Sequence, residues 1–276
     1  MGKQEHVIQL KMESSDQFIK LIDKISLGQE DMLPLYFKNN GNELEISSIK
    51  RFTSMISEGF IKIQGNEDSY ISKDIKLGFI SSDMLKTIFS VFKDEAFFLI
   101  FKKFTEKQIE KLVLVNKKKM VEIPLTRLIK DFKNLDLNKE MVFELDISEE
   151  KNEIKKLCAI GAKQNENFYL YFIKNGNEYV PELVFGENMD YKFTLKLEKQ
   201  IEEVFINNLI SNAQINKDDD GYFLAFHREM LKNVFDKIDK KSEESITIKL
   251  NIFGGFYICE KNEQNTFNYG FNSVVN

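Results

Sequence analysis

Short runs of alternating apolar and polar residues occupy most of the chain, and each half also contains two segments with apolar residues at helical spacing. The helical segments of the first half begin at Ser14-Ser15-Asp16 and Ser81-Ser82-Asp83, whose side chains are typical of helix caps. Their apolar faces contain Phe18, Leu21, Ile22 and Ile25, and then Met84, Leu85, Ile88, Phe89 and Phe92. The alternating runs predict strands at residues 5–12, 33–38, 44–49, 52–63, 75–80, 96–104, 109–116 and 120–125.

The second half repeats this order of elements. One helix is predicted after the cap Ser148-Glu149-Glu150, and another over the apolar positions of residues 230–238. The predicted strands lie at residues 141–147, 168–173, 179–185, 191–197, 222–226, 246–251, 253–260 and 266–274. Each half therefore contains a strand, a helix, several strands, a second helix and three strands, which indicates an internally duplicated α+β fold. An insertion at residues 199–217 predicts one added strand or short helix in the second half.

A length of 276 residues suits two domains of average size. We expect a first domain at residues 1–126, a connector at 127–139 and a second domain at 140–276. The connector is neither alternating nor capped, yet it is rich in apolar side chains, so it must dock on other parts of the protein. These side chains are Leu128, Ile129, Phe132, Leu135 and Leu137.

Composition restricts the possible functions. With 42% hydrophobic and 30% charged residues, the chain can form packed cores. A net charge of -5 argues against a protein that simply coats DNA, so any affinity for phosphate must come from locally segregated charge. The two cysteines, Cys158 and Cys259, lie in apolar segments far apart in sequence and favour buried thiols over a disulfide. The absence of a signal-like start and of any apolar run of about 20 residues predicts a cytoplasmic protein without membrane contact.

Residues suited to catalysis or metal binding are sparse. His6 and His227 are the only histidines, and no Walker-type loop or GxGxxG motif is present. The stretch 218–221 has three aspartates, but a calcium loop that started there would place Phe223 where glycine is required. A solvated turn is the better interpretation. Lys117-Lys118-Lys119 predicts a basic hairpin tip, with phosphate contact as the second interpretation. We therefore expect a protein that is not an enzyme and uses no cofactor or metal.

The order of elements resembles that of DNA sliding clamps of the proliferating cell nuclear antigen (PCNA) type, an architecture that clamps of tailed phages share. The segments Ser14 to Ser26, Ile75 to Leu125, Met141 to Lys163 and Gly221 to Val274 carry this resemblance. It implies two duplicated clamp domains, each with antiparallel sheets and two short helices lining one face. It also implies a homotrimeric ring, closed by pairing of edge strands, that encircles double-stranded DNA without sequence specificity. Such a processivity factor tethers the replicative DNA polymerase and is opened by a separate clamp-loader ATPase.

The resemblance requires that the four helices present positive charge. The basic residues on or near them are Lys20, Lys24, Lys86, Lys93, Lys151, Lys155, Lys156, Lys163, Arg228, Lys232, Lys237 and Lys240. We expect these side chains to contact DNA phosphates without reading bases. The alternative is that they form the solvated faces of ordinary amphipathic helices.

The resemblance also implies that partner proteins insert a short peptide with apolar anchors beside the connector and the C-terminus. The matching residues are Leu128, Ile129, Phe132, Leu135, Leu137, Val274 and Val275. The alternative is that these side chains attach the connector to the two sheets; both interpretations can hold, since some residues can anchor while others line the pocket.

Two other functions stay open: a non-ring processivity factor of the same fold, and a β-rich structural or adaptor protein without a DNA role. A chain rich in Lys, Asn and Ile is compatible with a phage of a low-GC bacterium, which would place it in the bacterial cytoplasm or nucleoid.

Overall fold

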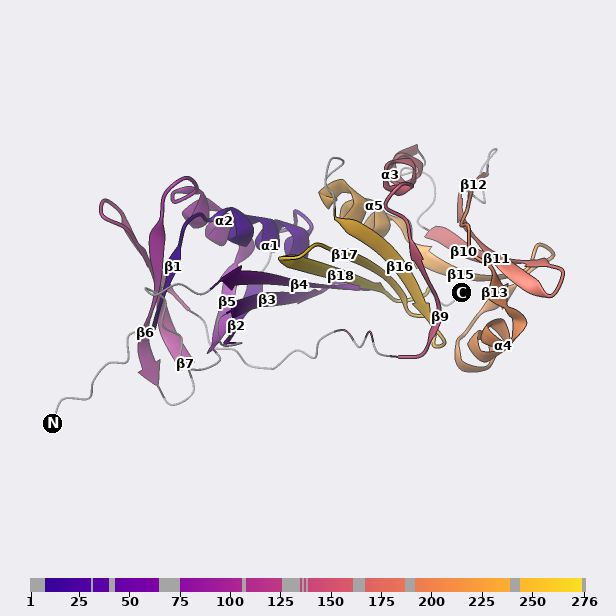
Figure 1. Ribbon diagram of the computed structural model, residues 1–276, viewed down its shortest axis with the longest axis horizontal. Coiled ribbons are helices and arrows are strands. Elements are labelled where there is room, and N and C mark those ends of the chain that lie inside the picture. The colour runs from indigo at the N-terminus through magenta and orange to yellow at the C-terminus, as the bar shows by residue number, and fades with distance from the viewer. Residues whose placement is uncertain are drawn as a thin grey trace. The chain divides into compact units, whose positions relative to one another are not determined.

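The computed structural model of the chain is shown in Figure 1. It describes residues 8–30, 32–39, 43–64, 75–105, 108–125, 135, 137, 139–160, 167–186, 192–238 and 244–274. Two compact units divide the chain. Unit 1 comprises Met1–Lys50, Glu58–Asn134 and Glu263–Phe267, and unit 2 comprises Arg51–Ser57, Leu135–Asn262 and Asn268–Asn276. The expected domain bounds at residues 126 and 140 stay a prediction, because most of the intervening connector lies outside the described residues.

The first half of the chain forms two antiparallel groups of strands and two helices. One group has the order β1-β6-β7-β8, and the other has the order β5-β2-β3-β4. Along the chain these elements are β1 (Ile8–Met12), α1 (Asp16–Ser26), β2 (Met32–Asn39), β3 (Glu43–Arg51), β4 (Met55–Gln64), β5 (Ile75–Ser81), α2 (Ser82–Ser90), β6 (Phe97–Thr105), β7 (Gln108–Val115) and β8 (Met120–Pro124).

The second half has the same plan with an addition. Its strands form the orders β12-β11-β10-β15-β14 and β18-β17-β16-β9. The elements are β9 (Met141–Asp146), α3 (Lys151–Ile160), β10 (Asn167–Asn175), β11 (Glu178–Phe185), β12 (Phe193–Lys196), β13 (Ile201–Glu202), α4 (Glu203–Asn212), β14 (Asn216–Lys217), β15 (Tyr222–His227), α5 (Arg228–Lys237), β16 (Ser245–Asn251), β17 (Phe256–Lys261) and β18 (Asn265–Phe271). The predicted duplicated α+β order is confirmed. The insertion forms β13, α4 and β14.

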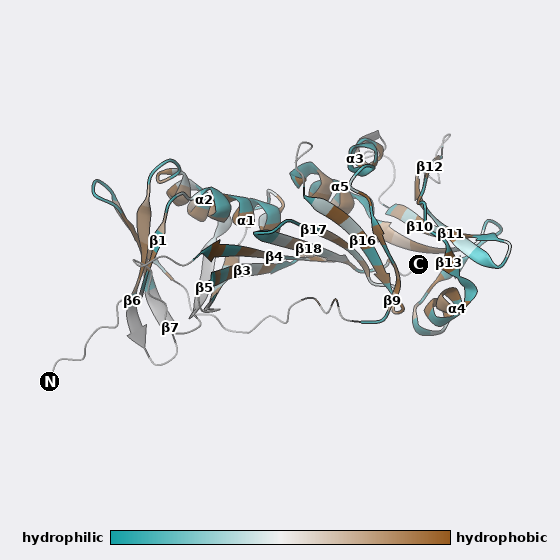
Figure 2. Ribbon diagram, viewed as in Figure 1, coloured by the Kyte–Doolittle hydropathy of each residue, from teal (hydrophilic) through white to brown (hydrophobic). Residues whose placement is uncertain are grey.

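In unit 1 the two helices pack on each other and on both groups of strands. The ring of Phe18 on α1 stacks on Phe89 of α2 with 4.6 Å between centroids. The Phe37 ring of β2 meets the Phe101 ring of β6 at 5.0 Å. All of these side chains are at most 1% exposed, so the aromatic residues predicted for the helix faces form the core of this unit. Figure 2 shows the resulting hydrophobic and hydrophilic bands along the helices and strands.

In unit 2 the corresponding core lies under β10. Phe168, Leu170 and Phe172 alternate along this strand and are all fully buried. The Phe168 ring lies 5.3 Å from that of Phe226 on β15 and 5.8 Å from that of Phe256 on β17. Alternate residues of one strand thus join the two groups of strands within the unit.

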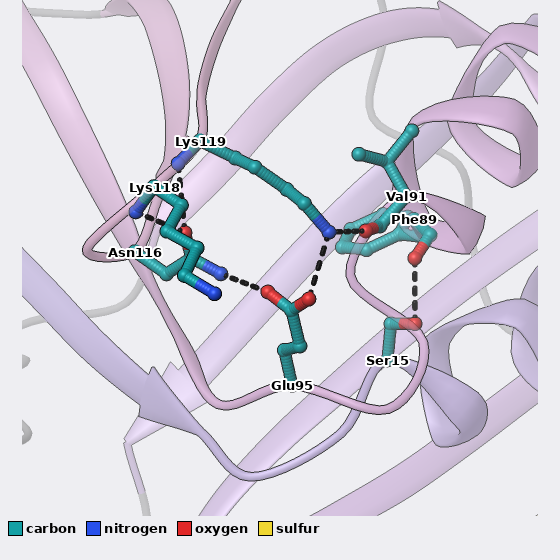
Figure 3. A network of polar contacts seen from close by, with 7 residues as sticks. All are labelled: Ser15, Phe89, Val91, Glu95, Asn116, Lys118 and Lys119. Atoms are coloured by element: carbon teal, nitrogen blue, oxygen red, sulfur yellow. Dashed lines mark hydrogen bonds and ion pairs between the residues drawn. The ribbon is translucent and has the colours of Figure 1, made fainter.

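The serines of the predicted caps act in different ways. Ser81 caps α2 as expected, because its hydroxyl accepts a hydrogen bond from the Met84 N–H at 3.3 Å. Ser15, however, donates its hydroxyl to the Phe89 carbonyl at 2.7 Å and so ties the start of α1 to α2 (Figure 3). Ser148 does not cap α3 either, since its hydroxyl accepts from the Ile246 N–H at 2.9 Å. Two of the predicted caps are therefore tertiary contacts.

Two strands near the C-terminus are shorter than predicted. β17 begins at Phe256, because Gly254 has a φ of +77° and the Asn251 side-chain oxygen accepts hydrogen bonds from the N–H groups of Phe253 and Gly255. These contacts make a tight turn, as the pair Gly254-Gly255 within the strand pattern predicts, and the strand therefore starts after it. β18 ends at Phe271, and Val274 forms an isolated antiparallel bridge with Ala225 of β15.

Candidate nucleic-acid interface

Each unit pairs two helices, α1 with α2 and α3 with α5, as the resemblance requires. Of the described residues expected to contact DNA, Lys93 and Lys156 are well exposed. Those with half-buried side chains are Lys20, Lys86, Lys151, Lys155, Lys232 and Lys237. Lys163 and Lys240 lie outside the described residues.

The helix pair of unit 2 is basic. α3 has three lysines and one glutamate, and α5 has three basic and two acidic residues, so the pair carries a net charge of +3. Asp236 of α5 accepts ion pairs from Lys232 at 2.9 Å and from Lys155 of α3 at 3.4 Å. Burial opposes ionisation of this carboxyl, but the contacts with these two lysines outweigh it and lower the pKa of Asp236. Asp236 thus partly neutralises the charges of Lys155 and Lys232, whereas the exposed Lys156 is not one of its partners.

The helix pair of unit 1 is neutral. α1 contains two aspartates and two lysines, and α2 contains one of each. Lys86 of α2 binds Asp23 of α1 at 3.1 Å, which holds the two helices together. The expected basic character therefore resides in the unit 2 pair and is absent from the unit 1 helices, although the exposed Lys93 follows α2.

Two residues expected to contact DNA are buried, and this part of the prediction is wrong. Arg228 is 2% exposed, and its guanidinium donates hydrogen bonds to the carbonyls of Leu157 and Cys158, the shortest at 2.8 Å. It satisfies carbonyls in the last turn of α3, which have no partner within the helix. Lys24 is 4% exposed, and its ammonium lies 5.4 Å from the centre of the Phe267 ring. Arg228 thus links α5 to α3, and Lys24 packs α1 against β18.

The predicted partner site is only partly described. Leu128, Ile129, Phe132 and Val275 lie outside the described residues. Leu135 and Leu137 are half-buried. A methyl group added at Gly270 of β18 would lie 2.9 Å from the Leu135 side chain, so Leu135 packs closely on this strand.

Val274 is also a packing residue. It lies against the buried cluster of Tyr169, Tyr171, Val184 and Ala225 on the sheet β12-β11-β10-β15-β14. Leu135 and Val274 thus attach the connector and the C-terminal segment to unit 2, as in the alternative interpretation.

An exposed aromatic side chain near this region was missed from the sequence. Phe253, in the turn between β16 and β17, is 52% exposed, and the Lys139 ammonium lies 5.2 Å from its ring centre. The neighbouring Gly254 approaches Ala213 at the end of α4. The pair Gly254-Gly255 predicts the tight turn that is observed, but the alternating pattern places Phe253 in the strand 253–260 and therefore at a packed position.

The aspartate-rich stretch 218–221 forms a turn, as predicted. One Asp218 carboxylate oxygen accepts the Tyr171 hydroxyl at 2.8 Å, and the other accepts the backbone N–H groups of Asp220 and Gly221. Burial opposes ionisation of Asp218, but these hydrogen bonds outweigh it and lower its pKa. Within the described part of the chain, no group of three His, Cys, Asp or Glu side chains could hold a metal ion.

Comparison with solved structures identifies the architecture. The chain superposes over 98% of its length on 99% of a PCNA chain from A. fulgidus, solved with the C-terminal region of FEN-1 bound, with a TM-score of 0.64 and 13% identity. PCNA from Entamoeba histolytica matches over 97% of this chain and 99% of its own, with a TM-score of 0.61 and 13% identity. A chain of the PCNA2-PCNA3 complex from Sulfolobus tokodaii matches over 96% and 99%, with a TM-score of 0.60 and 14% identity. The chain therefore has the PCNA-type sliding-clamp fold over its full length.

At the level of sequence, no family model and no curated protein matches this chain. Among the described residues, no helix has the length and apolar character needed to cross a membrane.

Proposed function

We propose that the chain is a sliding clamp that encircles duplex DNA and tethers a replicative polymerase, without catalysing a reaction itself. The full-length match to the clamp fold carries this proposal. The basic pair of α3 and α5 supports it, because the resemblance implies that the paired helices are the elements that face DNA.

The contact with DNA is electrostatic and weak. Lys156 is exposed, Lys151 and Lys237 are half-buried, and the helix pair without the buried Arg228 carries a net charge of +2. On duplex DNA, the logarithm of the binding constant falls with the logarithm of the salt concentration, and each phosphate contact adds about 0.9 to this slope. A few contacts therefore give weak, salt-sensitive binding. Weak contact with the backbone alone permits sliding, whereas tight contact would hold the ring in place.

Closure of the ring requires two different sheet edges. β8 ends one sheet and carries Met120, which is 65% exposed. β12 ends another sheet and carries the half-buried Phe193 and Leu195. Pairing β8 of one copy with β12 of the next would cover these edges and generate a closed homotrimer by a repeated head-to-tail contact.

The partner site that we propose lies beside the connector in unit 2. Leu135 is engaged in packing, so Leu137 and the exposed Phe253 are the better candidates to meet a partner's apolar anchors. A polymerase would dock there, and a separate clamp-loader ATPase would open the ring. A phage protein acting in a bacterial cytoplasm or nucleoid fits the composition.

The DNA contact is tested by replacing Lys151, Lys156 and Lys237 together with alanine. Binding to a short labelled duplex, followed by fluorescence anisotropy at low salt, should be weak in the wild type and weaker in the variant. The salt slope should fall by about 0.9 for each phosphate contact that is lost. A matched variant with alanine at the exposed Lys199 and Lys261 should behave as the wild type. If the triple variant had the same duplex affinity and salt slope as the wild type, an adaptor protein without a DNA role would be favoured.

The neutral α1 and α2 pair favours one alternative, a non-ring processivity factor that grips DNA through unit 2 alone. Sedimentation at micromolar concentration distinguishes the two. A clamp has three times the chain mass of 32.4 kDa, and the non-ring factor stays at 32.4 kDa or twice that mass. Met120→Asp should convert the trimer to a folded monomer, because it places a charge on the proposed pairing edge.

A further inference from the structure

A cavity of about 370 Å³ opens on the sheet β1-β6-β7-β8 of unit 1, beside the tip of the β7–β8 hairpin. Its apolar wall includes Ala96 and Phe98, and its polar rim includes Lys11, Glu95, Asn116, Lys117 and Lys118. The volume is at the lower end of that of ligand pockets and suits one large apolar side chain. None of these residues belongs to the DNA contact or the connector-side partner site proposed above.

The cavity lies on the face of the sheet opposite to the helices. The Phe97 ring points into the core, 5.1 Å from Phe92 and 6.2 Å from Phe89 of α2. Phe98, the next residue of β6, projects from the other face and is half-buried. Lys11 of β1 stands opposite Phe98 in the strand register and shares that face. The apolar wall around Phe98 is therefore turned away from the helix pair.

A polar network links the rim of the cavity to the end of α2, as Figure 3 shows. The Asn116 side-chain oxygen accepts the backbone N–H groups of Lys118 and Lys119 at 2.9 and 2.8 Å, and its amide nitrogen donates to Glu95 at 2.6 Å. The Lys119 ammonium donates to Glu95 and to the Val91 carbonyl, both at 2.9 Å. The hydrogen bonds from Lys119 and Asn116 lower the pKa of Glu95. The hairpin tip is thus fixed to the end of α2 before any ligand binds, which reduces the ordering cost of binding.

The charge of the rim is positive. Lys117 and Lys118 are exposed, and neither forms an ion pair with another described residue. The negative charge of Glu95 is matched by Lys119, and Lys11 lies 3.6 Å from Glu13. Beyond the ion pair of Lys119 with Glu95, Lys117 and Lys118 thus add two positive charges beside an apolar cavity, in a chain whose net charge is -5.

We propose that this cavity is a second protein-docking site, which binds an acidic peptide segment of a partner. One aromatic or aliphatic side chain of the peptide fills the space beside Phe98, and flanking carboxylates meet Lys117 and Lys118. An apolar anchor with charged flanks uses both features of the site. A DNA backbone would use only the lysines and leave the apolar wall exposed to water, so the observations favour a peptide.

The test uses the full chain and labelled synthetic peptides in fluorescence anisotropy. The probes are an Asp/Glu-rich peptide with one central Phe, the same peptide with Ser in place of Phe, and a Lys-rich peptide with the Phe. Two variants address the two features separately: Lys117→Glu with Lys118→Glu reverses the rim charge, and Ala96→Trp fills the cavity from an exposed position. Lys199→Glu with Lys261→Glu is the matched charge control.

We expect the acidic Phe peptide to bind best and to weaken as salt increases. Each of the two site variants should weaken it by about fivefold or more, while the control variant leaves it unchanged. Equal binding of the three peptides, or no effect of Ala96→Trp, would overturn the proposal. Loss of duplex binding in the charge-reversed variant, with no peptide binding by the wild type, would overturn it in favour of a phosphate contact. The solution mass of each variant is measured alongside, so a failure of ring formation is distinguished from a failure of this site.

Discussion

Replacing Arg228 with alanine separates a structural role of this residue from a role in DNA contact. The guanidinium donates three hydrogen bonds to the Leu157 and Cys158 carbonyls, at 2.8 to 3.2 Å, and is 2% exposed. Removing it leaves the carbonyls of the buried Leu157 and Cys158, in the last turn of α3, without these partners. An unsatisfied buried polar group costs about 1–3 kcal/mol. With two such carbonyls, we expect Arg228→Ala to lower the free energy of unfolding by about 2–6 kcal/mol.

The assay is equilibrium unfolding in guanidinium chloride, followed by far-ultraviolet circular dichroism. Arg228→Lys is the conservative control: it keeps the charge but reaches fewer acceptors, so its stability should lie between those of the wild type and Arg228→Ala. Lys156→Ala is the surface control and should stay within about 0.5 kcal/mol of the wild type. If Arg228→Ala were as stable as the wild type but bound duplex DNA more weakly, the assignment of Arg228 to the protein interior would be refuted.

Three further predictions concern packing, pH and thiol reactivity. Gly59→Ala should lower stability by about 1–3 kcal/mol, because the added methyl group would lie 2.7–2.9 Å from three core side chains, and an unchanged denaturation midpoint would contradict this packing. Folding lowers the pKa of Asp218 below its ordinary value of 3.8. The ionised carboxylate therefore contributes to folding stability above pH 3.8, and this contribution is lost as the pH falls from 3.8 through the lowered pKa. Asp218→Asn should therefore be less stable than the wild type at pH 7, with a difference that shrinks in acid; a difference independent of pH would contradict the hydrogen bond from Tyr171. Burial raises the pKa of Cys158 to about 12, so iodoacetamide should label it in unfolded protein and hardly at all in native protein at neutral pH, whereas rapid native labelling would show that the α3–α5 pair opens.

The duplicated order of elements could be predicted because it depends on local periodicity. Phe18, Leu21, Ile22 and Ile25 are spaced for a helix face, and all four are fully buried in α1. The tripled lysines at residues 117–119 were correctly expected at a hairpin tip, between β7 and β8. Such local patterns can be read without knowing which residues far apart in the sequence are in contact.

The candidate DNA contacts were harder to predict, because burial of a polar side chain depends on the neighbouring element. Arg228 is the first residue of α5, a position that in sequence resembles any exposed start of a helix. It is buried only because the end of α3 lies beside it and offers carbonyls. Lys24 is buried for a similar reason, since its apolar stem and ammonium lie against Phe267, more than two hundred residues later in sequence.

The exposed Phe253 is the opposite case. An apolar residue in an alternating run predicts a packed strand position, but the two glycines that follow and the Asn251 side chain form a turn. The turn leaves the Phe253 ring exposed to solvent, with the Lys139 ammonium over its face. Side-chain hydrogen bonds of this kind compete with strand pairing, and periodicity does not reveal which will prevail.

A threading experiment tests directly whether the protein holds DNA by enclosure, as we propose. The protein is incubated with a linear duplex attached to beads at one end, the free end is then blocked with streptavidin or left open, and the beads are washed at about 0.5 M salt, where phosphate contacts are screened. A closed clamp should stay on the blocked duplex, leave the open one, and be released from the blocked duplex by one restriction cut. Equal loss from blocked and open DNA in the salt wash would contradict enclosure and show that charge alone holds the protein.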